Sequence, residues 1–263
     1  MHLQVLSSGS GGNSALIRAG RARVLVDAGL TLAEMQARLE LAGVPPPVGE
    51  RPTLDHVLVT HGHLDHARSA GAIARKHRAL LHGSEAMLST PSFRRAKRLS
   101  TLRVGAECVL DEELGLRARN VPIPHDAHPT IAFRIEHEGR VAVVLTDMGR
   151  PDEFVARQLH GAHLLVLEFN HDRNMLLEGS YPAQLKRRVA GDAGHLSNDQ
   201  SAQMLRWLAG DELHTLVLAH LSLHNNTPEL ALAAAHGVLA ELGRSDVRVL
   251  VASQHEVGEN LTV

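Results

Sequence analysis

The run from Thr60 to His66 holds three histidines and one aspartate within six residues: His61, His63, Asp65 and His66. Imidazole nitrogen binds Zn, Mn, Fe and related ions, and carboxylate oxygen suits the harder cations. A mixed set of this density predicts a metal site of the hydrolytic kind. A histidine-rich turn without function is the other interpretation. The run follows an apolar strand and opens a helical segment, however, which is a common setting for site residues.

Three further residues of the same types occupy corresponding places along the chain. His125, Asp147 and His220 each come directly after an apolar segment. Strand ends are held by a rigid sheet and commonly form sites, so four strands that each deliver such a residue indicate one shared metal centre. His128 is the alternative to His125, and an ordinary loop histidine or turn carboxylate is the alternative at each position.

Short apolar strands and helical patterns occur in both halves of the chain. In the first half we expect strands at 3–6, 15–18, 24–26, 56–59 and 79–82, and helices at 32–42 and 67–76. In the second half we expect a hairpin of 130–136 with 141–145, strands at 163–167, 216–219 and 247–251, and helices at 199–209 and 228–242. This order predicts an α/β (α+β) fold with two sheets covered by helices, a four-layer αββα sandwich formed by residues 1–263 as one domain.

Composition excludes several classes of protein. Of the 263 residues, 44% are hydrophobic and only 2% aromatic, so a large core must be built from aliphatic side chains. The single cysteine, Cys108, excludes an internal disulfide and fits a reducing compartment. We find no secretory signal and no apolar run of about 20 residues, and therefore expect a cytoplasmic protein without a membrane partner. The net charge of −2 predicts that any nucleic-acid-binding surface is local.

The pattern His-x-His-x-Asp-His resembles the signature of the metallo-β-lactamase superfamily, and the later residues fall where that family has its ligands. The resemblance implies the metallo-β-lactamase fold and two divalent metal ions, Zn or Mn, with Fe as a further option. Imidazole at position 63 favours a hydrolase, because relatives with two-iron redox chemistry usually carry a carboxylate there. The implied ligands are His61, His63 and His125 for the first ion and Asp65, His66 and His220 for the second, with Asp147 bridging both.

Two such ions about 3.5–4 Å apart lower the pKa of a bridging water from about 15.7 towards about 7. The resulting metal-bound hydroxide would attack the substrate. Asp27 matches another motif of the family, and we expect it to orient the histidine loop through hydrogen bonds without binding metal, although a plain turn aspartate would look the same. The glycine-rich loop 7–14 lets the backbone pass close to a ligand, and an ordinary turn explains it equally well.

Several later segments resemble the YycJ/WalJ branch of the superfamily. They are Asn-His-Asp at 170–172, Tyr-Pro-x-x-Leu-Lys-x-Arg at 181–188, Gly-His-Leu-Ser-Asn at 194–198, Ala-His-Leu-Ser at 219–222 and Asn-Asn-Thr-Pro-Glu at 225–229. Together with the loop 7–14 they extend the resemblance over nearly the whole chain. The motifs are specific as a set, and the branch implies a nuclease, most often a 5′-to-3′ exonuclease on DNA.

Glu168 and His195 match a strand-end glutamate and a Gly-His-Ser segment of the tRNA 3′-processing ribonucleases of this fold. In those enzymes the histidine, held by the glutamate, acts on the leaving group. Phosphodiester cleavage expels a sugar alkoxide, which leaves poorly unless it is protonated. We therefore expect His195 to be a general acid or phosphate ligand and Glu168 to orient it, with Asp65 as the further catalytic residue. A capping role at the following helix is the alternative for His195.

Residues near these motifs are the predicted substrate contacts. They are Ser197, Asn198, Lys186, Arg188 and His171, and packing within a loop explains the last equally well. Phosphate contacts are also expected from the clusters 94–103 and 186–188, although a solvated helix face explains the first cluster as well. With 263 residues we expect no large clamp domain, so the substrate would be held by loops of the core or by a dimer partner.

The alternatives to a DNA exonuclease share its metal centre. They are a small-molecule (cyclic) phosphodiesterase, an RNA-processing nuclease and a thioester or lactone hydrolase. A basic groove leading away from the metals would distinguish a nuclease from the first alternative. The Glu168–His195 pair argues against acyl hydrolysis, because acyl substrates have less need of a proton donor.

Overall fold

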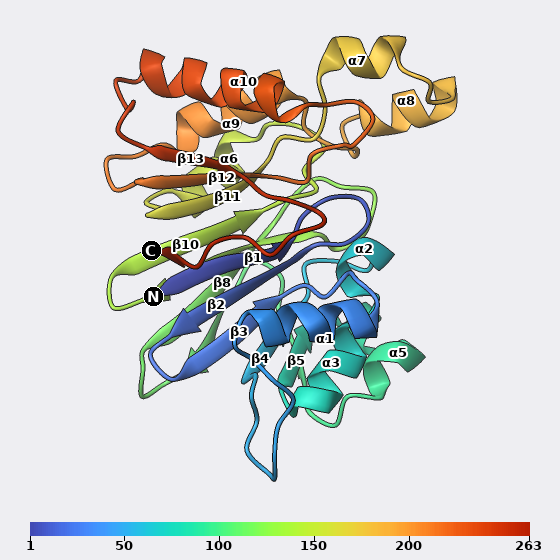
Figure 1. Cartoon of the computed structure of the whole chain (residues 1–263), viewed down its shortest axis with the longest axis vertical. Helices are drawn as coiled ribbons and strands as arrows, with labels where there is room; N and C mark the ends of the chain where they lie inside the picture. The colour runs from blue at the N-terminus through green and yellow to red at the C-terminus, as the bar shows by residue number, and fades with distance from the viewer.

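The computed structural model describes residues 1–263 as two seven-stranded β-sheets packed face to face, with helices on both outer surfaces (Figure 1). This arrangement confirms the predicted four-layer αββα sandwich. The first sheet has the order β14-β1-β2-β3-β4-β5-β6 and the second has the order β13-β12-β11-β10-β9-β8-β7.

Both sheets join an antiparallel part to a parallel part. In the first sheet β1–β3 are antiparallel and β3–β6 are parallel, and its strands are β1 (His2–Ser7), β2 (Ser14–Ala19), β3 (Ala22–Val26), β4 (His56–Leu58), β5 (Leu80–Gly83), β6 (Leu99–Thr101) and β14 (Leu261–Thr262). In the second sheet β7–β10 are antiparallel and β10–β13 are parallel, and its strands are β7 (Glu107–Asp111), β8 (Leu116–Pro122), β9 (Ile131–His137), β10 (Arg140–Leu145), β11 (Leu164–Glu168), β12 (Thr215–Ala219) and β13 (Arg248–Val251). Parallel strands carry the residues that follow them to one edge of the sandwich.

Helices cover each sheet on its outer face. The first sheet is covered by α1 (Leu32–Leu41), α2 (Leu64–Ala67), α3 (Ala70–His77), α4 (Glu85–Leu88) and α5 (Pro91–Arg94), and the second by α6 (Glu153–Leu159), α9 (Asn198–Leu208) and α10 (Pro228–Glu241). Two further helices, α7 (Arg173–Glu178) and α8 (Ala183–Val189), project beyond the sheet at the upper right of Figure 1. None of the helices has the length and apolarity that crossing a bilayer requires.

The strand period of two explains how one strand serves two core layers. On β10, Val143 packs into the core between the second sheet and its helices, whereas its neighbours Ala142 and Val144 pack between the two sheets. Central strands therefore read as continuous apolar runs. Full burial of one such aliphatic side chain contributes about 1.5–3 kcal/mol.

Most predicted elements are confirmed with ends that differ by a few residues, but three expectations need correction. The expected helix 67–76 is two helices, because Ser69 turns its backbone N–H and hydroxyl to the carbonyl of Ala28 between α2 and α3. The segment 247–251 is not the last strand, since β14 follows and pairs with β1. The strands β6 and β7 and the helices α4–α8 were not expected.

Buried imidazoles should make the folded state sensitive to acid. Burial, with smaller contributions from the nearby charges of His56 and Arg98, lowers the pKa of His82 to about 3. In the unfolded chain the ring titrates near about 6.5. The unfolded state therefore binds a proton that the folded state refuses. The free energy of unfolding should fall as the pH drops from about 6.5 towards about 4, by up to about 1.4 kcal/mol per pH unit for this ring.

We expect His82→Gln to reduce this pH slope by about that amount, because glutamine does not titrate and still offers a hydrogen-bonding group to His56, 2.9 Å away. Urea unfolding between about pH 7 and about pH 4.5 measures the slope. The exposed His236→Gln is the matched control and should leave the slope unchanged. Equal slopes for His82→Gln and the wild type would contradict this account of the buried ring.

Candidate metal centre and active site

Seven side chains with metal-binding chemistry meet at one edge of the sandwich, beyond the ends of the parallel strands. They form two groups, and within each group the ligand atoms lie within 4.8 Å of one another. The first group is His61, His63 and His125, and the second is Asp65, His66, Asp147 and His220. The structure thus brings together every residue predicted as a ligand, in the two groups that the sequence resemblance implied. His128, the alternative to His125, is exposed and belongs to neither group.

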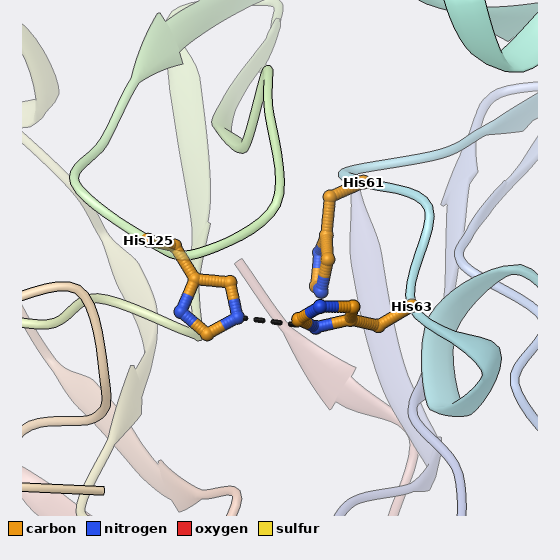
Figure 2. Close-up of side chains that lie close together, drawn as sticks. All are labelled: His61, His63 and His125. Atoms are coloured by element: carbon orange, nitrogen blue, oxygen red, sulfur yellow. Dashed lines mark hydrogen bonds between the residues drawn. The ribbon is translucent and has the colours of Figure 1, made fainter. Parts of the chain in front are cut away.

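The first group joins the histidine loop to a loop from the second sheet. Nδ1 of His125 donates to the carbonyl oxygen of Gly194 at 2.9 Å, which leaves the lone pair on Nε2. That Nε2 lies 3.2 Å from Nδ1 of His63, with His61 beside it (Figure 2). A hydrogen bond at one ring nitrogen is how proteins orient a histidine whose other nitrogen binds metal.

Asp27, which belongs to neither group, holds the histidine loop at both ends. Its Oδ1 accepts from the backbone N–H of Thr60 at 2.8 Å, and its Oδ2 accepts from the Thr60 hydroxyl at 2.8 Å and from Nδ1 of His66 at 2.7 Å. Nε2 of His66 then lies 3.0 Å from Oδ2 of Asp147. An aspartate that orients the histidine loop by hydrogen bonds, as expected for Asp27, would make contacts of this kind.

The backbone bends sharply where three of these residues leave their strands. Asp27, Asp147 and His220 have φ angles of 61°, 60° and 55°, in the left-handed region. Each of these non-glycine residues costs about 1–2 kcal/mol in this conformation. Such strain concentrates at functional sites, where the surrounding structure holds it in place. Here the turn directs each side chain from the end of its strand into the centre.

Close approach of the loops also requires a glycine. A Cβ on Gly29 would lie 1.6 Å from the carbonyl oxygen of Asp65, so no larger residue fits there. The same carbonyl accepts the backbone N–H of Asn13 at 2.7 Å. The glycine-rich loop 7–14 is therefore packed against the histidine loop.

Two buried polar atoms of the cluster form no hydrogen bond: Nε2 of His61, and Oδ2 of Asp147, whose contact with Nε2 of His66 at 3.0 Å is an ion-pair contact without hydrogen-bond geometry. His61 is fully buried and Asp147 is 1% exposed. A buried polar atom without a partner costs about 1–3 kcal/mol. Bound cations would supply the missing partners, and the mixed imidazole and carboxylate donors suit Zn or Mn. The residues present therefore fit divalent metal ions.

The protonation of the cluster leads to the same conclusion. Burial lowers the pKa of His61 to about 2, so this ring is neutral. Burial also opposes the charge on His220, but the carboxylates of Asp147 and Asp65 outweigh it and raise the pKa of His220 to about 9. Asp147 and Asp27 likewise hold the pKa of His66 well above its usual range against the effect of burial. Protons on these histidines balance the buried carboxylates, and metal binding would release them.

A second constellation lies beside the first. Glu168, the last residue of β11, is fully buried, and its Oε1 accepts Nδ1–H of His195 at 2.7 Å. Its Oε2 accepts the backbone N–H of Met148 at 2.9 Å, which fixes the carboxylate. Nδ1 of His195 is also 3.6 Å from Oδ1 of Asp147, so the pair borders the metal centre. The His195 side chain remains 20% exposed, and its Nε2 is the nitrogen left for a substrate.

Residues 22–221 match a family described as a beta-lactamase superfamily domain. The match covers more than half of the chain and contains all the predicted ligands. The chain belongs to the metallo-β-lactamase superfamily.

Members of the superfamily resemble this chain over most of its length. Exodeoxyribonuclease YycJ of Bacillus anthracis is 31% identical over 247 residues, which cover 92% of this chain and 90% of that protein. Exodeoxyribonuclease WalJ of Streptococcus pneumoniae is 31% identical over 234 residues, which cover 86% and 84% respectively. The crystal structure of Zn²⁺-bound PqqB from Methylobacterium extorquens superposes with a TM-score of 0.73 at 15% identity and covers 100% of both chains, a likeness of fold.

The structure gives Ser197 and Asn198 tasks within the fold. Ser197, and not His195, caps α9: its hydroxyl accepts from the backbone of Gln200, whose side chain accepts the Ser197 N–H. The amide of Asn198 exchanges two hydrogen bonds of 2.9 Å with the amide of Asn226. Both side chains are buried and already hydrogen-bonded within the protein, so the structure gives no support to the prediction that they contact the substrate.

The other predicted substrate contacts have different surroundings. Lys186 donates to the carbonyl of Leu177 at 2.6 Å and so ties α8 to the end of α7. His171 is 2% exposed, and burial lowers its pKa to about 4, so it is a neutral, packed ring. Arg188 reaches the metal centre through Asp126.

Four residues of the site were not predicted: Asp126, Asn13, Ser8 and Asn170. Asp126 accepts from Nε of Arg188 at 2.6 Å with one oxygen, and its other oxygen lies 3.4 Å from Nε2 of His63. Asn13 places its amide 2.9 Å from Nε2 of His66, while Ser8 accepts the backbone N–H of His220 at 2.7 Å and Asn170 donates to its carbonyl at 2.9 Å. The available signals were the polar residues of the loop 7–14 and positions next to predicted residues.

We expect Asp27→Asn to weaken metal binding by about 10- to 100-fold, because the amide cannot accept from both Thr60 and His66 as the carboxylate does. Competition of the folded protein with a chromophoric chelator measures the affinity. The exposed Asp211→Asn is the control with the same charge change. An affinity of Asp27→Asn equal to that of the control would show that the carboxylate does not position the ligands.

Proposed function

We propose that the chain is a dinuclear-metal-dependent nuclease that degrades DNA as a 5′-to-3′ exonuclease. The observation that carries the proposal is the His195–Glu168 pair, held at 2.7 Å on the border of the candidate metal centre. A sugar alkoxide leaves readily only when a proton reaches it, and an oriented imidazole can donate that proton. The choice of DNA and of an exonuclease is supported by the two relatives named exodeoxyribonuclease.

The metal ions would be held by the two groups described above, with Asp147 between them. When bound, they would activate a water and neutralise charge on the phosphoryl oxygens. Glu168 keeps Nδ1–H of His195 occupied, so Nε2 is directed to the leaving oxygen. Arg188, with 58% of its side chain exposed and its Nε on Asp126, stands where a phosphate would approach the centre.

The direct test is incubation of the metal-loaded protein with end-labelled duplex DNA, with and without a 5′-phosphate. We expect progressive shortening from the 5′ end, abolished in the His61→Ala/Asp65→Ala double variant because both ligand groups lose a member. Intact DNA together with rapid cleavage of bis(p-nitrophenyl) phosphate would instead indicate a small-molecule phosphodiesterase.

The role of His195 predicts a dependence on the leaving group. For His195→Ala we expect DNA cleavage to fall by about 10²–10⁴-fold, the usual contribution of a general acid. Hydrolysis of bis(p-nitrophenyl) phosphate should change little, because nitrophenolate leaves without a proton. Steady-state rates on the two substrates with equally metal-loaded proteins measure the effect. An equal loss on both substrates would assign His195 to the binding of metal or phosphate.

A further inference from the structure

Basic residues are concentrated in one segment of this weakly acidic chain. Positions 68–103 contain nine lysines and arginines and a single acidic residue, Glu85, which gives the segment a net charge of +8. The whole chain has a charge of −2, so the remaining residues carry −10. This segregation is strong enough to create a local positive field on a protein that is acidic elsewhere.

The fold gathers part of this charge around one cleft. A cleft of about 730 Å³ is lined by five basic residues that come from the end of α3 and from the segment before β6, namely Arg75, Lys76, Arg78, Lys97 and Arg98. We call these five residues the basic cleft. All of them are exposed, and Glu50 is the single acidic residue in the lining.

The side chains of the basic cleft form no ion pairs. Arginines on other parts of the surface do, such as Arg21 with Glu113, Arg206 with Glu241 and Arg248 with Glu259. Five cations around one cleft, with Glu50 as the only carboxylate in the lining, repel one another, which costs folding free energy. An anionic ligand with several charges would remove that repulsion.

The basic cleft lies where β5 and β6 begin, at the edge of the sandwich opposite to the metal centre, and helix α3 spans the distance between the two. Met87 on α4 lies next to Gly62 of the histidine loop, and Ser92 on α5 lies against Gly71 at the start of α3. At the other end of α3, Arg98 approaches the carbonyl of Arg78 at 3.4 Å. Residues 91–98 therefore run alongside α3, from the histidine-loop end of that helix to the basic cleft. Arg68, Arg94 and Arg95, all exposed, continue the positive charge along this course.

We propose that the basic cleft binds the phosphate backbone of the DNA strand that extends away from the metal centre. This inference rests on the proposed nuclease function and adds the surface that holds the substrate. Evenly spaced phosphates match several separate cations, whereas a small diester has one charge and no use for them. Contacts of this kind hold a substrate regardless of sequence, as an enzyme that moves along a strand requires.

The test compares the wild type with a variant that lacks four of the positive charges, Arg75→Gln/Arg78→Gln/Lys97→Gln/Arg98→Gln. The control, Arg119→Gln/Arg140→Gln/Arg157→Gln/Arg206→Gln, makes the same charge change at exposed positions elsewhere. Fluorescence anisotropy with labelled duplex DNA gives affinity as a function of salt, and bis(p-nitrophenyl) phosphate reports on the metal centre.

We expect the cleft variant to bind DNA about 10- to 100-fold more weakly and the slope of log affinity against log salt to become shallower by about 3 to 4, because up to four phosphate contacts are lost. Its KM for DNA should rise while hydrolysis of the small diester stays unchanged. DNA affinity and salt slope equal to those of the control would overturn the inference, and continued DNA degradation in that case would leave the nuclease function standing. Cleft-dependent binding of DNA that the wild type never degrades would support the cleft and refute the nuclease.

Discussion

The structure depends on one buried charge, the carboxylate of Asp147. This side chain is 1% exposed, and one of its oxygens has no hydrogen-bond partner. An isolated carboxylate in a protein interior is costly unless cations compensate it. Nearby His220 and His66 are held protonated by it, and metal ions would take over their task. Loops from both sheets converge on this carboxylate, and together they supply the positive groups that compensate its charge.

The sandwich provides that convergence through its two parallel halves. Strands β3 and β4 of one sheet and β10, β11 and β12 of the other end at the same edge, so residues far apart in sequence meet there. Left-handed backbone at Asp27, Asp147 and His220 aims the side chains inward at an energetic cost that the packed sheets bear. The His195–Glu168 pair uses the same edge, which places an oriented imidazole beside the candidate metal centre.

The fold and most of the site could be predicted because both depend on local patterns. Apolar strands mark the layers, and His61 to His66 form a dense cluster that needs no tertiary information. Other features lack such signals: β14 has two residues, and α8 buries none of its side chains, so neither shows an apolar pattern. The tasks of Ser197 and Asn198 depend on partners up to 28 residues away, and the basic cleft joins segments that only the fold brings together.

The most direct test of the central claim is the number of metal ions bound per chain, measured by native mass spectrometry after loading with Zn²⁺ or Mn²⁺. We predict two ions for the wild type and loss of at least one in Asp147→Asn, because that carboxylate belongs to the second ligand group and also lies 3.9 Å from Nε2 of His125 in the first. This prediction would be contradicted by a wild type that binds fewer than two ions, or by an Asp147→Asn variant that retains both with unchanged affinity.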